Sequence, residues 1–347
     1  VPLFRGEGSF GSRLAPTPAA ARYTSVRLSK DFDRYFRDNE ILEEQHDPEN
    51  PEPKFYLPLI PWVLVNGVKG IAVGFATEIQ PRAPKDLIKV CRDYIESGTL
   101  PKRIKPTLPE FDGKVLLDRK KDTWYCEGVW NLKSKTQLEI TELPYGIPRD
   151  KFVEHLDKLE EKGEIASYYD YCDKNGFNFD VRLKRGTKQL TTAKIAQMFK
   201  LRTYLNENFT TINEHGEVQV FSSEVELLKY FCDLRLQYVI KRLQYLIARD
   251  TEALRFAKVK LDFISRVLSG SLTFVGVDVK GLKSKLLSTI SDVQQDDLDR
   301  LVKVTASQFC SDSVKQLENK IYELQQAITS NRKKNAAQVY IQDLGEL

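Results

Sequence analysis

The sequence predicts an α+β protein of several domains that ends in a long coiled-coil hairpin. Strand and helix signals alternate through the middle of the chain, from about residue 81 to residue 221. From Ser222 to Ser269, by contrast, neither proline nor glycine interrupts a repeat of apolar residues. The length of 347 residues exceeds one typical domain, and a hydrophobic content of 41% can supply more than one core. We therefore expect three parts, residues 1–80, 81–221 and 222–347.

The first part mixes helical signals with turns. Ala19 to Phe36 follows a proline-containing segment and carries apolar residues at helical spacing, which predicts a helix. The acidic, proline-rich stretch from Asp47 to Pro53 indicates a surface loop. Tyr56 to Val65 is apolar but broken by prolines, and it ends in the strong turn dipeptide Asn66-Gly67.

The middle part is predicted to combine two helices with several strands. One helix covers Asp86 to Ser97 and is closed by Gly98, and the other covers Arg149 to Lys162 and is followed by Gly163. Alternation of apolar and polar residues predicts the strands Val115–Leu117, Thr123–Val129, Gln137–Thr141, Asn178–Leu183 and Val218–Phe221.

The last part has the heptad spacing of a coiled coil. Apolar side chains, with Asp250 as the polar exception, recur at steps of three and four residues: Leu236, Ile240, Leu243, Ile247, Asp250, Leu254, Ala257, Leu261, Ile264 and Leu268. A helix of about 45 residues spans roughly 65–70 Å. A second run consists of Leu317, Ile321, Leu324 and Ile328. The two helices predict an antiparallel hairpin with a small helical head at about residues 270–312, a design that also suits a plain spacer or dimerisation rod.

The charge is nearly balanced overall but basic at the start of the chain. The net charge is +4, whereas residues 1–30 carry one acid, Glu7, against five cations: Arg5, Arg13, Arg22, Arg27 and Lys30. Such a patch suits a polyanion such as nucleic acid, although a solvated basic face is the simpler alternative.

Cysteine, histidine and hydropathy patterns exclude several classes. The five cysteines are scattered without a CxxC pair, which indicates reduced thiols in a cytosolic or nuclear compartment. The three histidines form no zinc pattern. We expect no membrane span and no secretory leader. Because Val1 stands inside an organised segment, we expect the natural protein to start earlier.

One dipeptide in the basic segment is a candidate for catalysis. Arg22 directly precedes Tyr23, behind a run of alanines. A free phenol, with a pKa of about 10, is a poor nucleophile, but an adjacent guanidinium can neutralise a phosphate under attack. Most tyrosines in amphipathic segments only pack, so the pair gains weight only from its surroundings.

Glycine-containing segments offer two further contacts for a polyanion. Ser9-Phe10-Gly11-Ser12 is either a phosphate-cradling turn or a simple turn. Gly67 to Gly74 places Ile71 beside Lys69, as an apolar wedge for a duplex or as a buried isoleucine at a sharp turn. A later basic cluster is solvated or touches phosphates: Arg182, Lys184, Arg185 and Lys188. No nucleotide phosphate loop and no acidic cluster for magnesium is visible, so any metal is expected to come from another polypeptide.

These motifs together resemble the DNA breakage–reunion part of type IIA topoisomerases. Gly8-Ser9-Phe10-Gly11-Ser12-Arg13, followed by Ala19-Ala20-Ala21-Arg22-Tyr23-Thr24, is similar to the family's Gly-x-Phe-Gly turn and Ala-Ala-x-Arg-Tyr nucleophile motif. Leu64-Val65-Asn66-Gly67 with Gly70-Ile71-Ala72-Val73-Gly74 is similar to its Leu-Val-Asn-Gly and Gly-Ile-x-x-Gly signature.

Two later segments extend the resemblance across nearly the whole chain. Ile140-Thr141-Glu142-Leu143-Pro144 matches a strand end of the family, and Tyr230 to Tyr238 matches the start of its long hairpin helix. The resemblance implies the remainder of a winged-helix DNA-cleavage domain in residues 1–80 and an α/β tower domain in residues 81–221. In residues 222–347 it implies a hairpin whose head is a dimerisation gate.

The same resemblance assigns roles to residues. Tyr23 would be the nucleophile that becomes joined to a 5′ phosphate of DNA, and Arg22 would stabilise the transition-state phosphate. Ile71 would be the wedge that bends the duplex. The remaining expected DNA contacts are Ser12, Arg13, Arg27 and Lys69.

The resemblance also implies partners and cofactors. The ATPase and metal-binding modules are not visible in this chain, which is the layout of a separate, bacteriophage-type DNA-cleaving subunit. Mg²⁺ and ATP would be bound by a larger partner subunit, and the chain would form homodimers on double-stranded DNA in the cytoplasm of the host cell, in DNA replication. Because no DNA-wrapping domain is visible after Leu347, we expect relaxation rather than active supercoiling.

Some features depart from the family or leave alternatives. Pro16-Thr17-Pro18 stands where relatives often have glycines with a lysine or aspartate, and a catalytic arginine and histidine of the family would precede Val1. The alternative function is a non-enzymatic DNA-binding protein on a coiled-coil dimerisation rod, with Tyr23 only structural. A tyrosine recombinase is disfavoured because no Arg…His-x-x-Arg set accompanies Tyr23.

Overall fold

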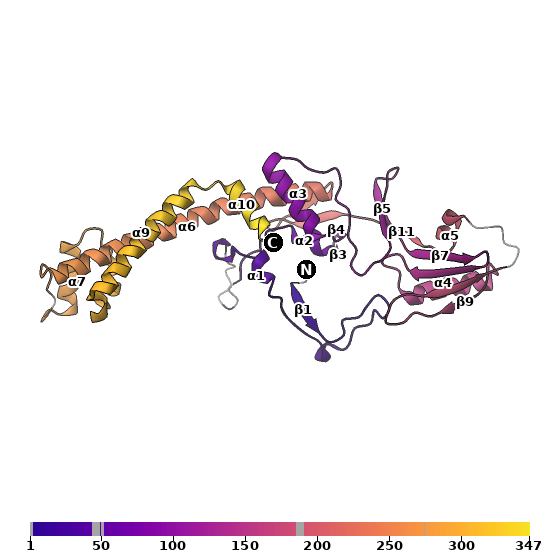
Figure 1. Ribbon diagram of the computed structural model, residues 1–347, viewed down its shortest axis with the longest axis horizontal. Coiled ribbons are helices and arrows are strands. Elements are labelled where there is room, and N and C mark those ends of the chain that lie inside the picture. The colour runs from indigo at the N-terminus through magenta and orange to yellow at the C-terminus, as the bar shows by residue number, and fades with distance from the viewer. Residues whose placement is uncertain (1–2, 44–48, 50–51, 185–190, 274) are drawn as a thin grey trace. The chain divides into compact units, whose positions relative to one another are not determined.

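The computed structural model describes residues 3–43, 49, 52–184, 191–273 and 275–347 (Figure 1). The chain divides into two compact units: Val1–Asp233 together with Leu344–Leu347, and Leu234–Asp343.

The start of the chain forms an antiparallel strand pair. β1 (Phe4–Glu7) pairs with β2 (Ser25–Leu28), and a single 3-10 turn, η1 (Ala21–Tyr23), precedes β2. The helix predicted from Ala19 to Phe36 is therefore wrong. Polar and apolar residues alternate from Ser25 to Leu28, which is the period of a strand, and pairing with a distant segment fixes the extended form.

The rest of the first part consists of short elements and one hairpin. These are α1 (Phe32–Tyr35), η2 (Asn39–Ile41), α2 (Trp62–Asn66), β3 (Val68–Ala72) and β4 (Phe75–Ile79). β3 and β4 form an antiparallel hairpin, and the turn predicted at Asn66-Gly67 is confirmed. Gly67 has a φ of 68°, and a Cβ there would lie 2.6 Å from the carbonyl oxygen of Ile79, so only glycine fits. Most of the predicted surface loop at Asp47 to Pro53 lies outside the described residues.

A four-stranded antiparallel sheet carries a large core of the first unit. Its strand order is β7 (Val129–Ser134), β8 (Gln137–Glu142), β10 (Phe179–Leu183), β9 (Ile165–Asp170). The helices α4 (Arg149–Glu161) and α5 (Thr192–Met198) contribute to this core. Phe152 of α4 and Phe179 of β10 pack edge to face with ring centroids 5.0 Å apart, and both are fully buried.

The first unit also contains a second, three-stranded sheet. Its strand order is β11 (Arg202–Leu205), β6 (Thr123–Glu127), β5 (Lys114–Asp118). A further hairpin, β12 (Phe209–Ile212) and β13 (Val218–Phe221), is joined to β4 by a bridge between Glu78 and Asn208. This bridge ties the β3–β4 hairpin to the strands that precede the long helix.

Most elements predicted for residues 81–221 are confirmed. The helix predicted at Asp86 to Ser97 is α3 (Pro84–Ser97), and the helix predicted at Arg149 to Lys162 is α4. Gly98 and Gly163 close these helices in the left-handed conformation, with φ of 71° and 68°. The predicted strands are present, and the one expected from Thr123 to Val129 is β6, which ends at Glu127. The sequence patterns missed β7, β9, β11, β12 and α5.

The second unit is helical. α6 (Glu224–Leu268) begins in the first unit and continues into the second, followed by α7 (Val279–Thr289), α8 (Gln295–Val302), η3 (Ala306–Phe309), α9 (Ser311–Lys333) and α10 (Ala336–Gly345). A core cluster joins Phe263 and Ile264 of α6 to Leu286 and Leu298 of the shorter helices, with Leu317 of α9 packed against it. From this head α9 runs back beside α6 (Figure 1), an arrangement in keeping with the predicted hairpin, whose coiled-coil and gate roles stay predictions.

The predicted heptad is buried at alternate positions. These are Leu243, Asp250, Ala257 and Ile264, whereas Ile240 and Leu268 are exposed. Asp250, the one polar member, forms an ion pair with Arg249, with 2.9 Å between Oδ1 and Nη2. In the second run, Ile328 is buried.

Candidate active site

Tyr23 stands on the single turn η1 with its side chain in solvent. The residue is 68% exposed, and no residue of η1 is buried. The turn is held by backbone bonds, since Tyr23 N donates to Ala20 O at 2.8 Å and Thr24 N donates to Ala21 O at 3.2 Å. The guanidinium carbon of Arg22 lies 4.8 Å from the centroid of the Tyr23 ring. The predicted pair is therefore both accessible and mutually in contact.

The turn that contains Gly8 and Gly11 packs closely against the backbone of the segment that carries Tyr23. Gly8 has a φ of 97°, and a Cβ there would lie 2.4 Å from the carbonyl oxygen of Tyr23. Gly11 has a φ of 84°, and its Cβ would lie 2.6 Å from the carbonyl oxygen of Pro16. Ala19 N donates to Ser9 O at 3.0 Å, which closes the loop. Both glycines are thus required by close backbone approach as well as by φ.

The strand pair next to Tyr23 concentrates positive charge. Arg5 and Arg27 lie directly opposite each other in the β1–β2 register. Glu7 forms an ion pair with Arg27 and accepts a hydrogen bond from Ser25 Oγ at 3.2 Å. Like charges opposite each other destabilise a strand pair, and a bound anion relieves that cost. Arg5 was named among the cations of the basic patch but not among the expected DNA contacts, and its place opposite Arg27 became visible only in the strand pairing.

Ser12 and Arg13 have different surroundings. Ser12 is exposed, and its Oγ accepts from Ala15 N at 3.1 Å. Arg13 points into the protein, where its guanidinium forms an ion pair with Glu142 at 2.9 Å and donates to the carbonyl oxygens of Glu110 and Leu143. The basic segment therefore divides into exposed cations and one cation that is engaged within the fold.

The β3–β4 hairpin presents apolar side chains to solvent. Ile71 is 91% exposed and Val73, at the turn, is fully exposed. The alternative of a buried isoleucine at a sharp turn is therefore wrong. Lys69 is exposed and forms an ion pair with Glu78 across the hairpin, with 2.9 Å between Nζ and Oε1. An exposed apolar tip beside a cation is typical of an interaction surface rather than of a core.

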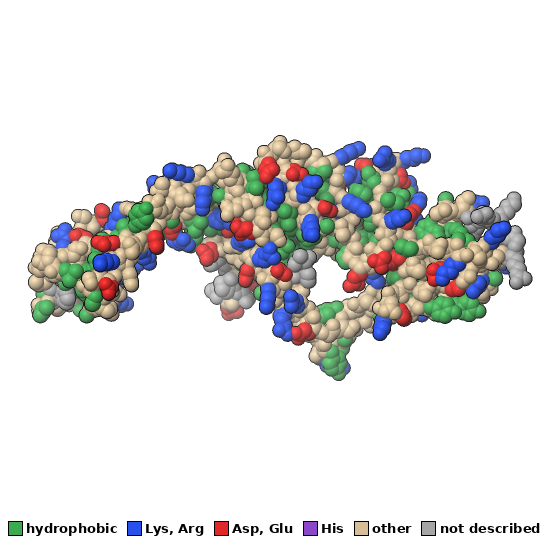
Figure 2. Space-filling view, in the orientation of Figure 1, with side chains coloured by type: hydrophobic (Ala, Val, Ile, Leu, Met, Phe, Trp, Pro, Cys, Tyr) green, Lys and Arg blue, Asp and Glu red, His purple; other side chains and the backbone are tan. Residues whose placement is uncertain are grey.

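Metal ligands are not gathered in the part of the chain that the structure describes. There, no group of three or more His, Cys, Asp or Glu side chains could hold a metal ion. All five cysteines are free thiols, as predicted. On the face drawn in Figure 2, lysine and arginine are interspersed with aspartate and glutamate. Of the predicted basic cluster, Arg182 and Lys184 are described, while Arg185 and Lys188 lie outside the described residues.

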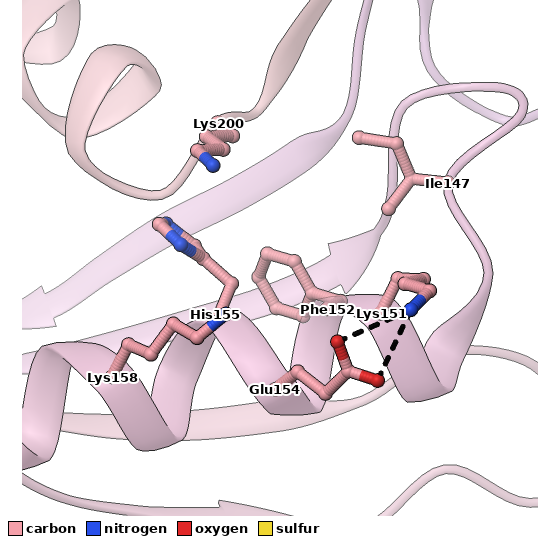
Figure 3. Close-up of a pocket in the computed structure, with 7 residues that line it drawn as sticks. All are labelled: Ile147, Lys151, Phe152, Glu154, His155, Lys158 and Lys200. Carbon is pink, nitrogen blue, oxygen red and sulfur yellow. Dashed lines mark hydrogen bonds and ion pairs between the residues drawn. The ribbon is translucent and has the colours of Figure 1, made fainter.

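A pocket of about 290 Å³ lies elsewhere, on α4 (Figure 3). Its lining is Ile147, Lys151, Phe152, Glu154, His155, Lys158 and Lys200. Lys151 and Glu154 pair at one end, at 3.2 Å, while His155 and Lys200 lie at the other, with His155 Nε2 2.9 Å from Met198 O. The pocket shares no residue with the Tyr23 loop, so it is not part of the candidate active site.

The described helices include none long and apolar enough to cross a membrane.

These features are the ones expected of the DNA breakage–reunion class of type II topoisomerases: an exposed Arg22-Tyr23 pair, a cationic strand pair beside it, an exposed apolar hairpin tip and a long helical hairpin. A profile of the DNA gyrase/topoisomerase IV A subunit matches residues 1–345, and the chain belongs to this family.

Individual relatives agree with this assignment. The chain is 36% identical to the DNA topoisomerase medium subunit of Enterobacteria phage T4, over 91% of this chain and 72% of that protein. It is 30% identical to the mitochondrial DNA topoisomerase 2 of Dictyostelium discoideum over 83% of this chain, but it spans only 23% of that enzyme. The DNA-binding, cleavage and re-ligation domain of Plasmodium falciparum topoisomerase II has the same fold, with a TM-score of 0.83 at 24% identity over 100% of this chain and 52% of that one.

The family resemblance drawn from the motifs is thus confirmed, including the likeness to a separate bacteriophage subunit. The enzyme interpretation is favoured over a non-enzymatic DNA-binding protein. The roles of individual residues are a separate question.

Proposed function

We propose that this chain is the DNA-cleaving subunit of an ATP-dependent type II topoisomerase, which breaks both strands of one duplex, lets a second duplex pass and reseals the first. The observation that carries the proposal is the exposed Tyr23 ring with the Arg22 guanidinium 4.8 Å from its centroid, on a loop next to Arg5 and Arg27.

The chemistry is a reversible transesterification at phosphorus. The phenolic oxygen of Tyr23 attacks the scissile phosphate, a bond forms between that oxygen and phosphorus, and the bond from phosphorus to the 3′ oxygen breaks. The phenol gives up its proton as it attacks and the 3′ oxygen takes up a proton as it leaves, so the net exchange is proton-neutral and the 5′ end stays bound to Tyr23. Because one phosphoester replaces another, resealing needs no external energy. Arg22 stabilises the additional negative charge at phosphorus in the transition state.

The exposed hairpin supplies the mechanical part of the proposal. Ile71 inserts between base pairs of the cleaved duplex, since burying its side chain there removes it from water. Bending a duplex costs about 1–6 kcal/mol, which added phosphate contacts offset. Ser12, Arg27 and Lys69 are exposed and suited to such contacts.

Cofactors and partners complete the proposal. The described residues of this chain offer no fit for a magnesium ion, so we assign Mg²⁺ and ATP to a larger partner subunit. The chain acts as a homodimer on DNA in the cytoplasm. Residues 1–80 and 81–221 correspond to the winged-helix remainder and the tower, and the head at about 270–312 serves as the dimerisation gate.

The test is Tyr23→Phe in the protein reconstituted with its ATPase subunit. We expect loss of magnesium-dependent cleavage and of relaxation, with DNA binding retained, because the ring remains and only the nucleophile is removed. Tyr56→Phe, a change at another exposed tyrosine, is the matched control and should leave both activities unchanged. Persistence of a denaturant-resistant protein–DNA adduct in Tyr23→Phe would exclude the proposed nucleophile.

A further inference from the structure

Glu142, at the end of β8, is a buried carboxylate whose two oxygens each accept hydrogen bonds from the protein. The residue is 4% exposed. Its Oε1 accepts from Leu143 N at 2.8 Å, and its Oε2 accepts from Asp112 N at 3.1 Å. Each oxygen also meets one terminal nitrogen of Arg13, at 2.9 Å and 3.0 Å, in a two-pronged ion pair. Such a geometry fixes both the position and the orientation of the guanidinium.

The Arg13 side chain, which is 20% exposed, makes further contacts around its guanidinium. Its Nη1 also donates to Glu110 O at 2.7 Å, and its Nη2 donates to Leu143 O at 3.0 Å. Three aromatic rings surround the guanidinium carbon, with centroids at 5.1 to 5.6 Å: Phe111, Tyr145 and Phe177. Both terminal nitrogens are therefore occupied by protein acceptors, which disfavours the direct phosphate contact expected for Arg13 from the sequence.

The loop that carries Arg13 leads directly to Tyr23. Leu14 packs against the core of the four-stranded sheet, so the loop is anchored at two successive residues. Three backbone contacts connect this anchored loop to η1. Gly11 contacts Pro16, Ala19 N donates to Ser9 O, and Gly8 contacts Tyr23 O. The anchor lies ten positions from Tyr23 along the chain, but backbone contacts connect the two.

We propose that Arg13 is a positioning residue: its ion pair with Glu142 anchors the glycine loop to the sheet and so sets where Tyr23 meets the scissile phosphate. This inference rests on the proposed function of Tyr23. A misplacement of about 1 Å at a reacting group can cost on the order of a hundredfold in rate. Loss of the anchor should therefore reduce the rate of cleavage without removing a DNA contact.

The experiment uses the complex reconstituted with the ATPase subunit, with Arg13→Ala, Arg13→Lys, Glu142→Gln and the double variant Arg13→Ala/Glu142→Gln. The single-turnover cleavage rate is measured on a defined duplex, and the Kd for that duplex and its salt dependence are measured in a Tyr23→Phe background. We expect Arg13→Ala and Glu142→Gln each to lower cleavage by roughly 30- to 100-fold, with the Kd changed by less than about twofold. The double variant should be no worse than either single one, and Arg13→Lys should recover little, because an ammonium cannot make the two-pronged pair.

Controls separate the possible outcomes. Arg27→Ala removes an exposed cation of the same segment and should weaken duplex binding rather than the cleavage step. Thermal unfolding checks that each variant is folded. If Glu142→Gln does not fold, Phe177→Leu takes its place, since it loosens the enclosure of Arg13 while keeping the ion pair.

A weaker duplex affinity for Arg13→Ala, with a salt slope reduced by about one contact and an unaffected Glu142→Gln, would show that Arg13 touches phosphate and would overturn the inference. Normal DNA cleavage by Arg13→Ala would also overturn the inference. If the wild-type complex itself forms no adduct at Tyr23, the proposed function fails instead, so the two failures are distinguishable.

Discussion

The α-carbon of Gly8 faces the carbonyl oxygen of Tyr23 so closely that a Cβ on Gly8 would lie 2.4 Å from that oxygen. Gly8 also has a φ of 97°, a backbone conformation that residues with a side chain rarely adopt. The glycine turn and the tyrosine turn are therefore in direct backbone contact.

Gly8→Ala should displace Tyr23 and lower the rate of DNA cleavage by about 10- to 100-fold. Gly216→Ala is the matched control, because Gly216 has a φ of 82° but an added Cβ would meet no atom within 4 Å. Both variants carry the strain of a positive φ, about 1–2 kcal/mol, which can be measured by denaturation. Equal cleavage rates for the two variants would show that the Gly8–Tyr23 contact does not position the nucleophile.

Ile71→Ala should reduce duplex bending and lower cleavage by about tenfold, since the side chain that would enter the base stack is shortened. Because Ile71 is 91% exposed, the free energy of unfolding should change by less than about 0.5 kcal/mol. Bending can be followed by energy transfer between dyes at the ends of a duplex. Ile212→Ala, at a 73% exposed isoleucine on β12, should bend DNA normally. Normal bending by Ile71→Ala would remove Ile71 from the mechanism.

Arg82→Ala should destabilise the first unit by about 3–5 kcal/mol. The Arg82 side chain is fully buried and holds Glu207 with two bonds of 2.8 and 2.9 Å, and Glu224 Oε2 lies 3.9 Å away. Its removal leaves two buried carboxylates without this cation. Arg182→Ala removes an arginine whose side chain is 46% exposed and whose pair with Asp180 is long, at 3.5 Å, and should cost less than about 1 kcal/mol. Chemical denaturation measures the free energy of unfolding of both variants. Similar unfolding midpoints for the two would show that Arg82 does not stabilise the fold through Glu207 and Glu224.

The elements that the sequence predicted well are those with strong local signals. α3 and α4 end at glycines with positive φ, and α6 has an uninterrupted apolar repeat. Ala19 to Phe36 was mispredicted because its strand character depends on pairing with β1, a partner outside any local window. The candidate site followed the same rule. Arg22-Tyr23 and Ile71 were predicted as site residues from motifs, and the structure places them on the surface, whereas the Arg13–Glu142 pair joins residues 129 positions apart and could only be recognised in the fold.

The stability of the second unit should fall in acid. Hydrogen bonds from Arg255, and the positive charge of that residue, lower the pKa of Asp297 below its usual value. A carboxyl group with a depressed pKa in the folded state stabilises the fold above its unfolded pKa, about 3.9, and this contribution is lost as the pH falls through the lower folded value. Asp297→Asn should be less stable than wild type at pH 6, by about 1–3 kcal/mol, and should show a smaller loss between pH 5 and about pH 2.5. Thermal unfolding at several pH values measures this. An unchanged pH dependence in Asp297→Asn would assign the acid sensitivity to other groups.

The central claim is that Tyr23 forms the covalent bond to DNA. The most direct measurement is to trap the adduct of the reconstituted enzyme in denaturant, digest the protein and the DNA, and locate the modified residue by mass spectrometry. The account predicts a peptide in which a nucleotide is attached through its 5′ phosphate to the Tyr23 oxygen. A nucleotide attached to any other residue, or linked through a 3′ phosphate, would contradict it.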